Sequence, residues 1–377
     1  MTHVLRQAKV QRGAPPDKSP PSDGPPPEAE DDLTSHVLPS GALISFSEIN
    51  TFESCKLKHF YRYKMRLSSR RYSGLRHLVV GSIVHDAIEE TYVREMNATP
   101  IGDPLDVADE IAAEIKKEYT HPAWFEFFDE DAFNMDAEIA RHLFRVWYNS
   151  LYRVERFSIF EPERAFETTI AGQGMLGYMD QVYTVGEELP QVGSDCRYSH
   201  AKEGSLPPGN YLGEVKTRGA SWSRRCKTLA LKSLQVKLYL TAMYKDGLEP
   251  QGAVYTVLKK PPKKVMFADD LKAALPKVAE HYARTDIEHF RRDIVPITVD
   301  EAFVAEVEEE VEPKVEAIRA FYEGDPFEAA SRVSKPSPNG YPCGWCDYNA
   351  MCHGSRSFDD SFAYKRRRTP TPRPAQE

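Results

Sequence analysis

Long hydrophobic runs are missing from this chain of 377 residues. No apolar stretch approaches the roughly 18–20 residues that cross a membrane, and the first residues lack the apolar core of a secretory signal peptide. These absences predict a soluble, cytoplasmic protein with no membrane partner. A phosphate loop of the form G-x4-GK-[ST] is also missing, which excludes a nucleotide-driven motor of that type within the chain. We find no internal repeat.

Cysteine is scarce, with six residues in the whole chain, and so low a content is not typical of a disulfide framework. Three of the six lie close together as Cys343, Cys346 and Cys352, in the spacing C-x2-C-x5-C. A tetrahedral metal needs a fourth ligand, for which Cys55, far upstream, and His353, next to Cys352, are the candidates. The spacing suits both zinc and a [4Fe–4S] cluster, and by itself it does not separate the two.

An overall positive charge is absent as well, since the formal net charge is −8. The basic residues are nevertheless concentrated: residues 56–76 and 215–245 hold eight Lys or Arg each and no acid, and Lys259, Lys260, Lys263 and Lys264 form a third cluster. Solvated surface faces would account for such stretches. Because both long stretches adjoin the motifs described below, we favour a protein that guides a polyanion to one place.

Composition divides the chain into three parts. Residues 1–40 hold eight prolines and no apolar period, which predicts a disordered leader. Residues 41–354 are expected to form one domain, with a helical part at about 86–160, a core at about 161–260, and C-terminal helices with the cysteine motif at 268–354. Residues 355–377 are polar and basic, which predicts a disordered tail.

Hydrophobic periodicity predicts helices and strands in alternating groups. A helix capped by Ser45 and Glu48 leads to Cys55 and continues into the aromatic and basic run at 58–64. Further helices are expected at 78–92, 105–119, 129–157, 228–244, roughly 268–292 and 299–323. Strands are expected at 164–171, 175–185, 211–217 and 252–258, with a long polar loop at 186–210.

Two acids and a lysine fall on neighbouring predicted strands. Glu214 and Lys216 are two residues apart, so their side chains point to one face of a strand, and Asp180 lies on the strand before. Carboxylates bind a divalent metal, the metal activates a water, and a lysine steadies an oxygen of the phosphate. The pattern therefore suits phosphodiester hydrolysis, although Asp…Glu-x-Lys taken alone is weak.

One histidine is a candidate metal ligand. His85 lies four residues after Gly81, so the two share a face of the predicted helix at 78–92. A glycine on that face lets another backbone or a ligand come close. A histidine on an apolar helix face is more often a satisfied core residue than a ligand, and spacing alone leaves both readings open.

Taken together, these motifs resemble the iron–sulfur members of the RecB-type branch of PD-(D/E)xK nucleases. That group includes CRISPR-associated and phage single-domain exonucleases and the nuclease domains of AddB-type helicase–nucleases. The matching motifs occur in family order over about residues 44–354: Ser45–Cys55, Gly81–His85, Gly177–Asp180, Gly213–Lys216, Gln235–Tyr239 and the cysteine triplet. Two departures stand out: Met179 rather than Pro precedes Asp180, which is common in this branch, and Glu214 stands where many relatives carry Asp.

The resemblance implies an α/β fold, a mixed sheet flanked by helices, with a helical insertion and an iron–sulfur cluster joining the terminal segments. It implies that His85, Asp180, Glu214 and the carbonyl of Val215 bind Mg²⁺ or Mn²⁺. Lys216 would stabilise charge on the phosphate or orient the water, with Gln235 and Tyr239 positioning it. The cluster ligands it implies are Cys55, Cys343, Cys346 and Cys352, with zinc as the alternative metal. Glu167 resembles an acid that precedes the Asp motif in relatives.

The expected activity is that of a metal-dependent exonuclease acting on single-stranded DNA or DNA ends, in recombination, repair or phage DNA processing. Aromatic residues among bases suit stacking on unpaired bases, and the DNA-contacting candidates are Lys58, Arg62, Trp222, Arg224 and Arg225. The alternatives are a non-catalytic DNA-binding accessory protein that keeps the fold, and a nuclease directed at RNA. A separate helicase or annealing partner is compatible with either.

Overall fold

The computed structural model describes residues 43–69, 72–120, 128–152, 158–185, 208–219, 231–334, 343, 346–354 and 364–366. All of them belong to one compact unit, His36–Glu377. The predicted leader, most of the loop at 186–210 and the basic loop at 220–230 lie outside the described residues.

A mixed sheet of six strands forms the centre of this unit, in the order β1-β4-β5-β6-β7 with β3 on the other edge of β4. The pairs β1–β4 and β5–β6 are parallel, and the pairs β3–β4, β4–β5 and β6–β7 are antiparallel. This confirms the predicted α/β fold with a mixed sheet. The strands are β1 (Ile44–Ser45), β3 (Ser158–Ile170), β4 (Gln173–Val185), β5 (Gly209–Gly219), β6 (Pro250–Lys260) and β7 (Phe290–Pro296).

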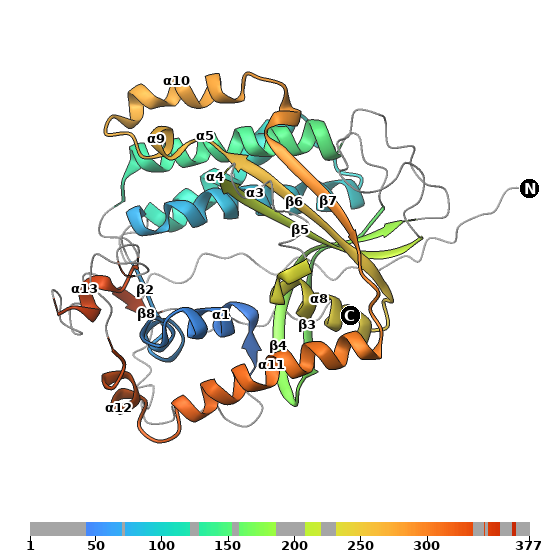
Figure 1. Cartoon of the computed structure of the whole chain (residues 1–377). Coiled ribbons are helices and arrows are strands. Elements are labelled where there is room, and N and C mark those ends of the chain that lie inside the picture. Colours follow the sequence, from blue (N-terminus) through green and yellow to red (C-terminus); the bar gives the residue numbers. More distant parts are fainter. Residues whose placement is uncertain are drawn as a thin grey trace, which may run out of the picture. The chain divides into compact units, whose positions relative to one another are not determined.

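Helices cover both faces of the sheet (Figure 1). One group packs with Val215 and Leu258: α3 (Tyr72–Met96), α4 (Pro104–Thr120), α5 (Glu130–Trp147) and α10 (Leu271–Tyr282). The other group packs with Leu212 and Val257: α1 (Phe46–Ser54), α8 (Leu234–Lys245) and α11 (Glu301–Phe321). Because β6 is apolar almost throughout and buried on both faces, it reads as an inner strand.

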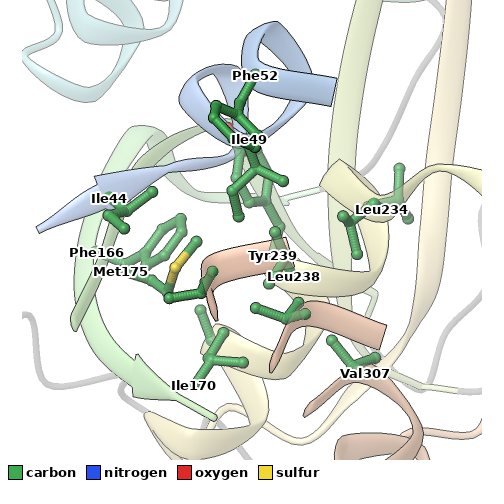
Figure 2. Close-up of a cluster of buried hydrophobic side chains, with 14 of the residues drawn as sticks. Ile44, Ile49, Phe52, Phe166, Ile170, Met175, Leu234, Leu238, Tyr239 and Val307 are labelled. Carbon is green, nitrogen blue, oxygen red and sulfur yellow. The ribbon is translucent and has the colours of Figure 1, made fainter. Parts of the chain in front are cut away.

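The cluster beneath α1, α8 and α11 draws on segments far apart in the sequence. Figure 2 shows Ile49 and Phe52 of α1 near Leu234 and Tyr239 of α8, with Val307 of α11 in the same cluster. Burial of these side chains fixes α8 against β5 and β6. It thereby holds one wall of the candidate site described below.

The first helix begins as its sequence predicts. Ser45 is the N-cap of α1, and its Oγ accepts a hydrogen bond from the backbone N–H of Glu48 at 3.2 Å. Glu48 does not complete the predicted reciprocal box with its own side chain, which contacts His59 instead. After a break at Cys55 the chain continues through α2 (Lys56–His59) and a π-helical turn, η1 (Phe60–Lys64).

Helices α3, α4, α5 and α11 confirm their predictions, as do strands β3 to β6, with longer bounds in most cases. A second π-helical turn, η2 (Tyr148–Tyr152), follows α5 within the predicted helix at 129–157, and residues 153–157 lie outside the described residues. The predicted helix at 228–244 is described from Leu231 onward, and Ser233 caps α8.

The predicted helix at roughly 268–292 is wrong in its second half. The chain forms α9 (Lys263–Met266) and α10, then η3 (Asp286–Glu288), and enters the sheet as β7. In β7, Arg292 and Ile294 lie on one face, and the strand pairs with β6 from Gly252 to Leu258. Pairing with the open edge of β6 and burial of these side chains outweigh the local helical pattern.

The two ends of the domain meet at a second, two-stranded sheet. β2 (Leu67–Ser69) pairs antiparallel with β8 (Tyr364–Arg366). The prediction of a disordered tail at 355–377 is therefore wrong at these three residues, because β2 supplies an edge to pair with; the rest of the tail lies outside the described residues. Two short helices precede it, α12 (Pro326–Ser331) and α13 (Asn349–Cys352).

In the part of the chain that the structure describes, no helix has the length and apolar character needed to cross a membrane.

Candidate active site

Strands β4 and β5 separate at the point where the predicted catalytic residues lie. Their antiparallel pairing stops at Gln181 and Gly213. On the same edge of β4, β1 pairs only with residues 175–176, so no ladder among the described strands covers residues 177–180 there. Asp180 is therefore the first residue beyond the pairing, and Glu214 lies opposite it on β5.

Asp180 is held from two directions. Its Oδ2 accepts a hydrogen bond from the backbone N–H of Val215 at 2.8 Å, which replaces the missing ladder bond. Its Oδ1 lies 3.3 Å from Nδ1 of His85, which reaches the site from α3. The carboxylate thus ties α3 to the point where the two strands separate.

Helix α3 lies against β5 at Gly81. A Cβ built on Gly81 would stand 3.6 Å from Oγ1 of Thr217, which is ordinary van der Waals contact. One helical turn further on, His85 faces Asp180. The predicted shared face of Gly81 and His85 therefore faces β4 and β5.

Glu214 and Lys216 face each other as the strand spacing predicts. Nζ of Lys216 forms an ion pair with Oε1 of Glu214. The Glu214 side chain is 0% exposed, whereas that of Lys216 is 21% exposed. Among the described residues, Oε2 of Glu214 has no hydrogen-bond partner. A buried carboxylate oxygen without a partner is costly, and a cation would remove that cost.

The four groups shift one another's ionisation. Burial, and then the nearby charge of Asp180, raise the pKa of Glu214 to about 7, although Lys216 opposes this. Burial alone would lower the pKa of Lys216 and of His85, but the surrounding carboxylates outweigh it and raise both. Burial would raise the pKa of Asp180, but His85 and Lys216 lower it. The site thus holds two neighbouring carboxylates whose pKa values shift in opposite directions: that of Glu214 is raised and that of Asp180 is lowered.

The Gln-x3-Tyr pair forms a wall of the site. Nε2 of Gln235 donates a hydrogen bond to the hydroxyl of Tyr239 at 3.2 Å, within α8. The ring of Tyr239 packs edge-on against Phe166, with centroids 5.3 Å apart. Burial, and then the charge of Glu214, raise the pKa of Tyr239, so this hydroxyl stays protonated beside the carboxylate. Gln235 therefore orients a tyrosine that lies near Glu214.

Gly177 makes this wall possible. A Cβ there would lie 2.6 Å from the ring of Phe166 and 3.1 Å from that of Tyr239. A side chain at this position would force the Phe166 ring to move and would press against the Tyr239 ring, so packing favours the glycine of the Gly177–Asp180 motif.

The donor set fits a hard divalent cation. Asp180 and Glu214 supply carboxylate oxygens, and the unpartnered Oε2 of Glu214 is the observation that favours a cation here. As the side chains stand, the described residues contain no group of three or more His, Cys, Asp or Glu in metal-ligand arrangement. Lys216 occupies the position beside Glu214 instead.

The cysteines from the two chain ends lie in one region. Cys55 and Cys352 contact the same apolar cluster, and the thiols of Cys55, Cys343 and Cys346 are free. Burial raises the pKa of the Cys346 thiol, although a backbone hydrogen bond from Tyr348 opposes this. Neither the thiols nor other described residues form a complete metal-ligand group as placed.

Neighbouring contacts join the same two segments. The hydroxyl of Tyr348 donates a hydrogen bond to the carbonyl of Leu67 at 2.7 Å, and its ring lies 5.5 Å from that of Tyr61. His353, the alternative ligand, has a buried Nε2 without a hydrogen-bond partner among the described residues. Cys55 and His353 therefore both remain candidates for the fourth metal ligand.

The predicted DNA-contacting residues are described only in part. Lys58 and Arg62 lie on α2 and η1, where the Arg62 guanidinium lies 5.7 Å from the centre of the Tyr63 ring. Trp222, Arg224 and Arg225 lie outside the described residues. Glu167 is exposed on β3, where it is paired with Leu176.

Sequence reasoning missed a buried polar group beside the first helix. His59 is 0% exposed; its Nδ1 lies 2.7 Å from the hydroxyl of Tyr322 and its Nε2 lies 3.2 Å from Glu48. His59 is the last residue of α2, Glu48 lies on α1, and Tyr322 follows the end of α11. No local sequence spacing therefore indicates that these three side chains meet. They fix α1, and with it Cys55, against α11.

A comparison with protein families agrees with this geometry. The family model described as the PD-(D/E)XK nuclease superfamily matches residues 43–191 and 212–353. These two segments include every candidate catalytic, metal and cysteine residue discussed above. No curated protein sequence gives a significant match.

Proposed function

Because this chain belongs to the PD-(D/E)XK nuclease superfamily, we propose that it is a Mg²⁺- or Mn²⁺-dependent exonuclease for single-stranded DNA or DNA ends. The proposed setting is recombination, repair or the processing of phage DNA, with a separate helicase or annealing protein as partner. The observation that carries the proposal is the convergence of His85, Asp180 and Glu214 with Lys216 where β4 and β5 separate.

His85, Asp180, Glu214 and the carbonyl of Val215 are the proposed ligands of the divalent cation. When bound, such a cation acts as a Lewis acid toward the phosphate and lowers the pKa of a water molecule. The buried Glu214 needs a positive neighbour, since its pKa is raised to about 7. In the cation's absence, Lys216 supplies part of that positive charge.

Lys216 is the proposed catalytic cation of the protein itself. Its carboxylate neighbours raise its pKa, so the ammonium stays charged at neutral pH. Because its side chain is partly exposed, it can donate hydrogen bonds to a phosphate oxygen. Tyr239, oriented by Gln235, limits the positions that Lys216 and Glu214 can take.

Cys55, Cys343, Cys346 and Cys352 are the proposed ligands of a [4Fe–4S] cluster. The support is that the segments carrying these four cysteines are packed and hydrogen-bonded together. Because these segments lie at opposite ends of the domain, the cluster would join them as a structural element. Zinc, with His353 as a competing ligand, is the alternative.

The proposed path of the DNA strand follows the basic stretches. Lys58 and Arg62 on α2 and η1 belong to the first, and Trp222, Arg224 and Arg225 to the second. Stacking of unpaired bases on aromatic rings, together with phosphate contacts, would favour single strands.

A cleavage assay tests the catalytic proposal. We expect wild-type protein with Mn²⁺ to degrade end-labelled single-stranded DNA, and Lys216→Ala to reduce the rate by about 10²–10³-fold, as loss of a charge-stabilising donor does. The matched control is Lys277→Ala, because Lys277 is exposed on α10, away from these motifs. DNA binding without cleavage by the wild type would instead support a non-catalytic binding protein, and cleavage of RNA in preference to DNA would overturn the substrate assignment.

A further inference from the structure

Strand β6 carries a tyrosine beside the candidate active site. β6 pairs with β5 in parallel, and Tyr255 is in register with Glu214. Side chains at paired positions of neighbouring strands point to the same face of a sheet. Because Lys216 lies two residues beyond Glu214 on β5, it shares that face. The register therefore places Tyr255 on the same face as the acid and the lysine.

The packing of the apolar residues agrees with this register. Leu212 and Tyr255 belong to the buried cluster that packs with α8. Val215 and Leu258 belong to the cluster that packs with α3 and α5, on the opposite face of the sheet. The tyrosine thus faces α8, which also carries the Gln-x3-Tyr wall of the site.

Strand β5 has a different neighbour on each side. On the β4 side is Asp180, whose Oδ2 accepts the backbone N–H of Val215 at 2.8 Å. On the β6 side is Tyr255. Same-face residues offset by two on adjacent strands are roughly 7–8 Å apart, a distance that long and aromatic side chains span. The ammonium of Lys216 can therefore turn toward carboxylates on one side or toward a phenol on the other.

The next acid along the sheet does not compete for this lysine. Asp293 of β7 stands directly opposite Tyr255 and is 1% exposed. Its carboxylate is held by the Arg291 guanidinium, with Nε 3.2 Å from Oδ2. Tyr255 itself is only 7% exposed, so bulk water has little access to its side chain. A phenol oxygen can accept one hydrogen bond while its O–H donates another.

Lys216 needs such an acceptor when Glu214 binds a metal. Its ammonium now pairs with Oε1 of Glu214. A divalent cation at that carboxylate repels the ammonium, because the two charges have the same sign. Burial lowers the pKa of Lys216, but the charges of Glu214, Asp180 and, after them, Tyr255 raise it. Tyr255 is thus the neighbour on the side away from the metal ligands.

We propose that Tyr255 is a positioning residue for Lys216: its phenol oxygen accepts a hydrogen bond from the Lys216 ammonium when Glu214 holds a divalent cation. This role rests on the proposed nuclease function, in which Glu214 is a metal ligand. It keeps the ammonium beside the site for the phosphate instead of leaving it in the metal's place.

Binding of Mn²⁺ to the full chain, measured by calorimetry without DNA, tests this role, with Glu214→Ala defining the heat that belongs to the site. Tyr255→Phe keeps the ring and removes the acceptor, so Mn²⁺ binding is expected to weaken about fivefold, the net worth of one hydrogen bond. Lys216→Met removes the competing ammonium and is expected to tighten binding. In the Lys216→Met background, Tyr255→Phe is expected to have no further effect, because the lysine that it positions is gone.

Tyr282→Phe is the matched control. It removes another buried tyrosine hydroxyl, which donates to the carbonyl of Lys259 at 3.0 Å, from a residue that packs on the opposite face of the sheet. This variant is expected to melt at a lower temperature and to keep the Mn²⁺ affinity of the wild type.

The possible failures are distinguishable. A Tyr255→Phe protein with wild-type melting temperature and unchanged Mn²⁺ affinity overturns the role of Tyr255 and leaves the nuclease proposal standing. Equal weakening by Tyr255→Phe with and without Lys216 also overturns it, since an effect of packing alone does not depend on the lysine. A wild-type protein that neither binds Mn²⁺ nor cleaves DNA overturns both proposals.

Discussion

Several ionisable side chains of this protein are buried where their charged forms are disfavoured. His289 is 4% exposed, and its ring lies 4.9 Å from that of His281 and 4.8 Å from that of Tyr282. Burial, and then the charge of His281, lower the pKa of His289 from 6.5 to about 4. Its Nε2 has no hydrogen-bond partner among the described residues, so nothing compensates a proton there.

This histidine predicts a loss of stability on mild acidification. Below pH 6.5, His289 is protonated in the unfolded chain, whereas in the folded protein it stays neutral until about pH 4. The unfolding free energy therefore falls as the pH falls through that window. Between pH 7 and pH 5, we expect wild type to lose about 1–2 kcal/mol of unfolding free energy more than His289→Phe does. Urea unfolding of both proteins at the two pH values measures the difference, and parallel pH profiles would contradict it.

At the scale of strands, glycines allow close pairing next to the site. Gly252 of β6 has φ +147, and a Cβ there would lie 2.2 Å from the carbonyl oxygen of Val295 and 2.9 Å from Cα of Pro296. Both neighbours are backbone atoms of β7, which cannot move without breaking the β6–β7 ladder. Gly213 is similar, because a Cβ there would lie 2.4 Å from the ring of Tyr183. The close packing around these inner strands thus depends on the absence of side chains at Gly213 and Gly252.

We expect Gly252→Ala to lower the unfolding free energy by about 2–4 kcal/mol, because it adds backbone strain at positive φ to a clash with β7. Chemical denaturation monitored by circular dichroism measures the loss.

Gly219→Ala is the matched control in the neighbouring strand. Nothing lies within 4 Å of its Cβ position, so a change within about 0.5 kcal/mol is expected. Equal effects of Gly252→Ala and Gly219→Ala would contradict the claim that a clash with β7 destabilises the Gly252 variant.

At the scale of the whole domain, the first and last described segments hold each other. β2 pairs with β8, the Tyr348 hydroxyl bonds to the carbonyl of Leu67, and Cys55 and Cys352 contact one apolar cluster. The buried contacts of His59 with Glu48 and Tyr322 add a further link between α1 and α11. A metal cluster bound by the cysteines would link two segments that are already in contact.

The proposed cluster therefore predicts coupled loss of metal and stability. Cys55→Ser is expected to lose iron and its broad absorption near ~400 nm, and to lower the melting temperature by about 5 °C or more. Anaerobic purification, metal analysis and thermal unfolding measure these effects. Tyr348→Phe, which removes the hydrogen bond to Leu67 and keeps the ring, is expected to keep its iron and lose about 1 kcal/mol of unfolding free energy.

Two results would contradict this prediction. Full iron content in Cys55→Ser would remove Cys55 from the ligand set and leave His353 as the fourth ligand. Zinc in place of iron in the wild type would keep the link between the ends but overturn the cluster assignment.

Much of the local structure follows from the sequence because it depends on neighbouring residues. The Ser45 cap, the strand spacing of Glu214 and Lys216, and the helical spacing of Gly81 and His85 appear in the structure as predicted. Each depends on a repeat of two to four residues, which is a property of the backbone itself. The motif order likewise indicated the nuclease superfamily.

The sequence alone determined the spacing of the candidate site residues and that helices and strands alternate around them. Only the tertiary structure decided that residues 290–296 join the sheet and that β8 pairs with β2. It also decided that β4 and β5 separate at Asp180. These features arise from strand pairing and burial between segments far apart in the chain. Local sequence periodicity reflects only neighbouring residues, so it does not reveal the free energy of such contacts.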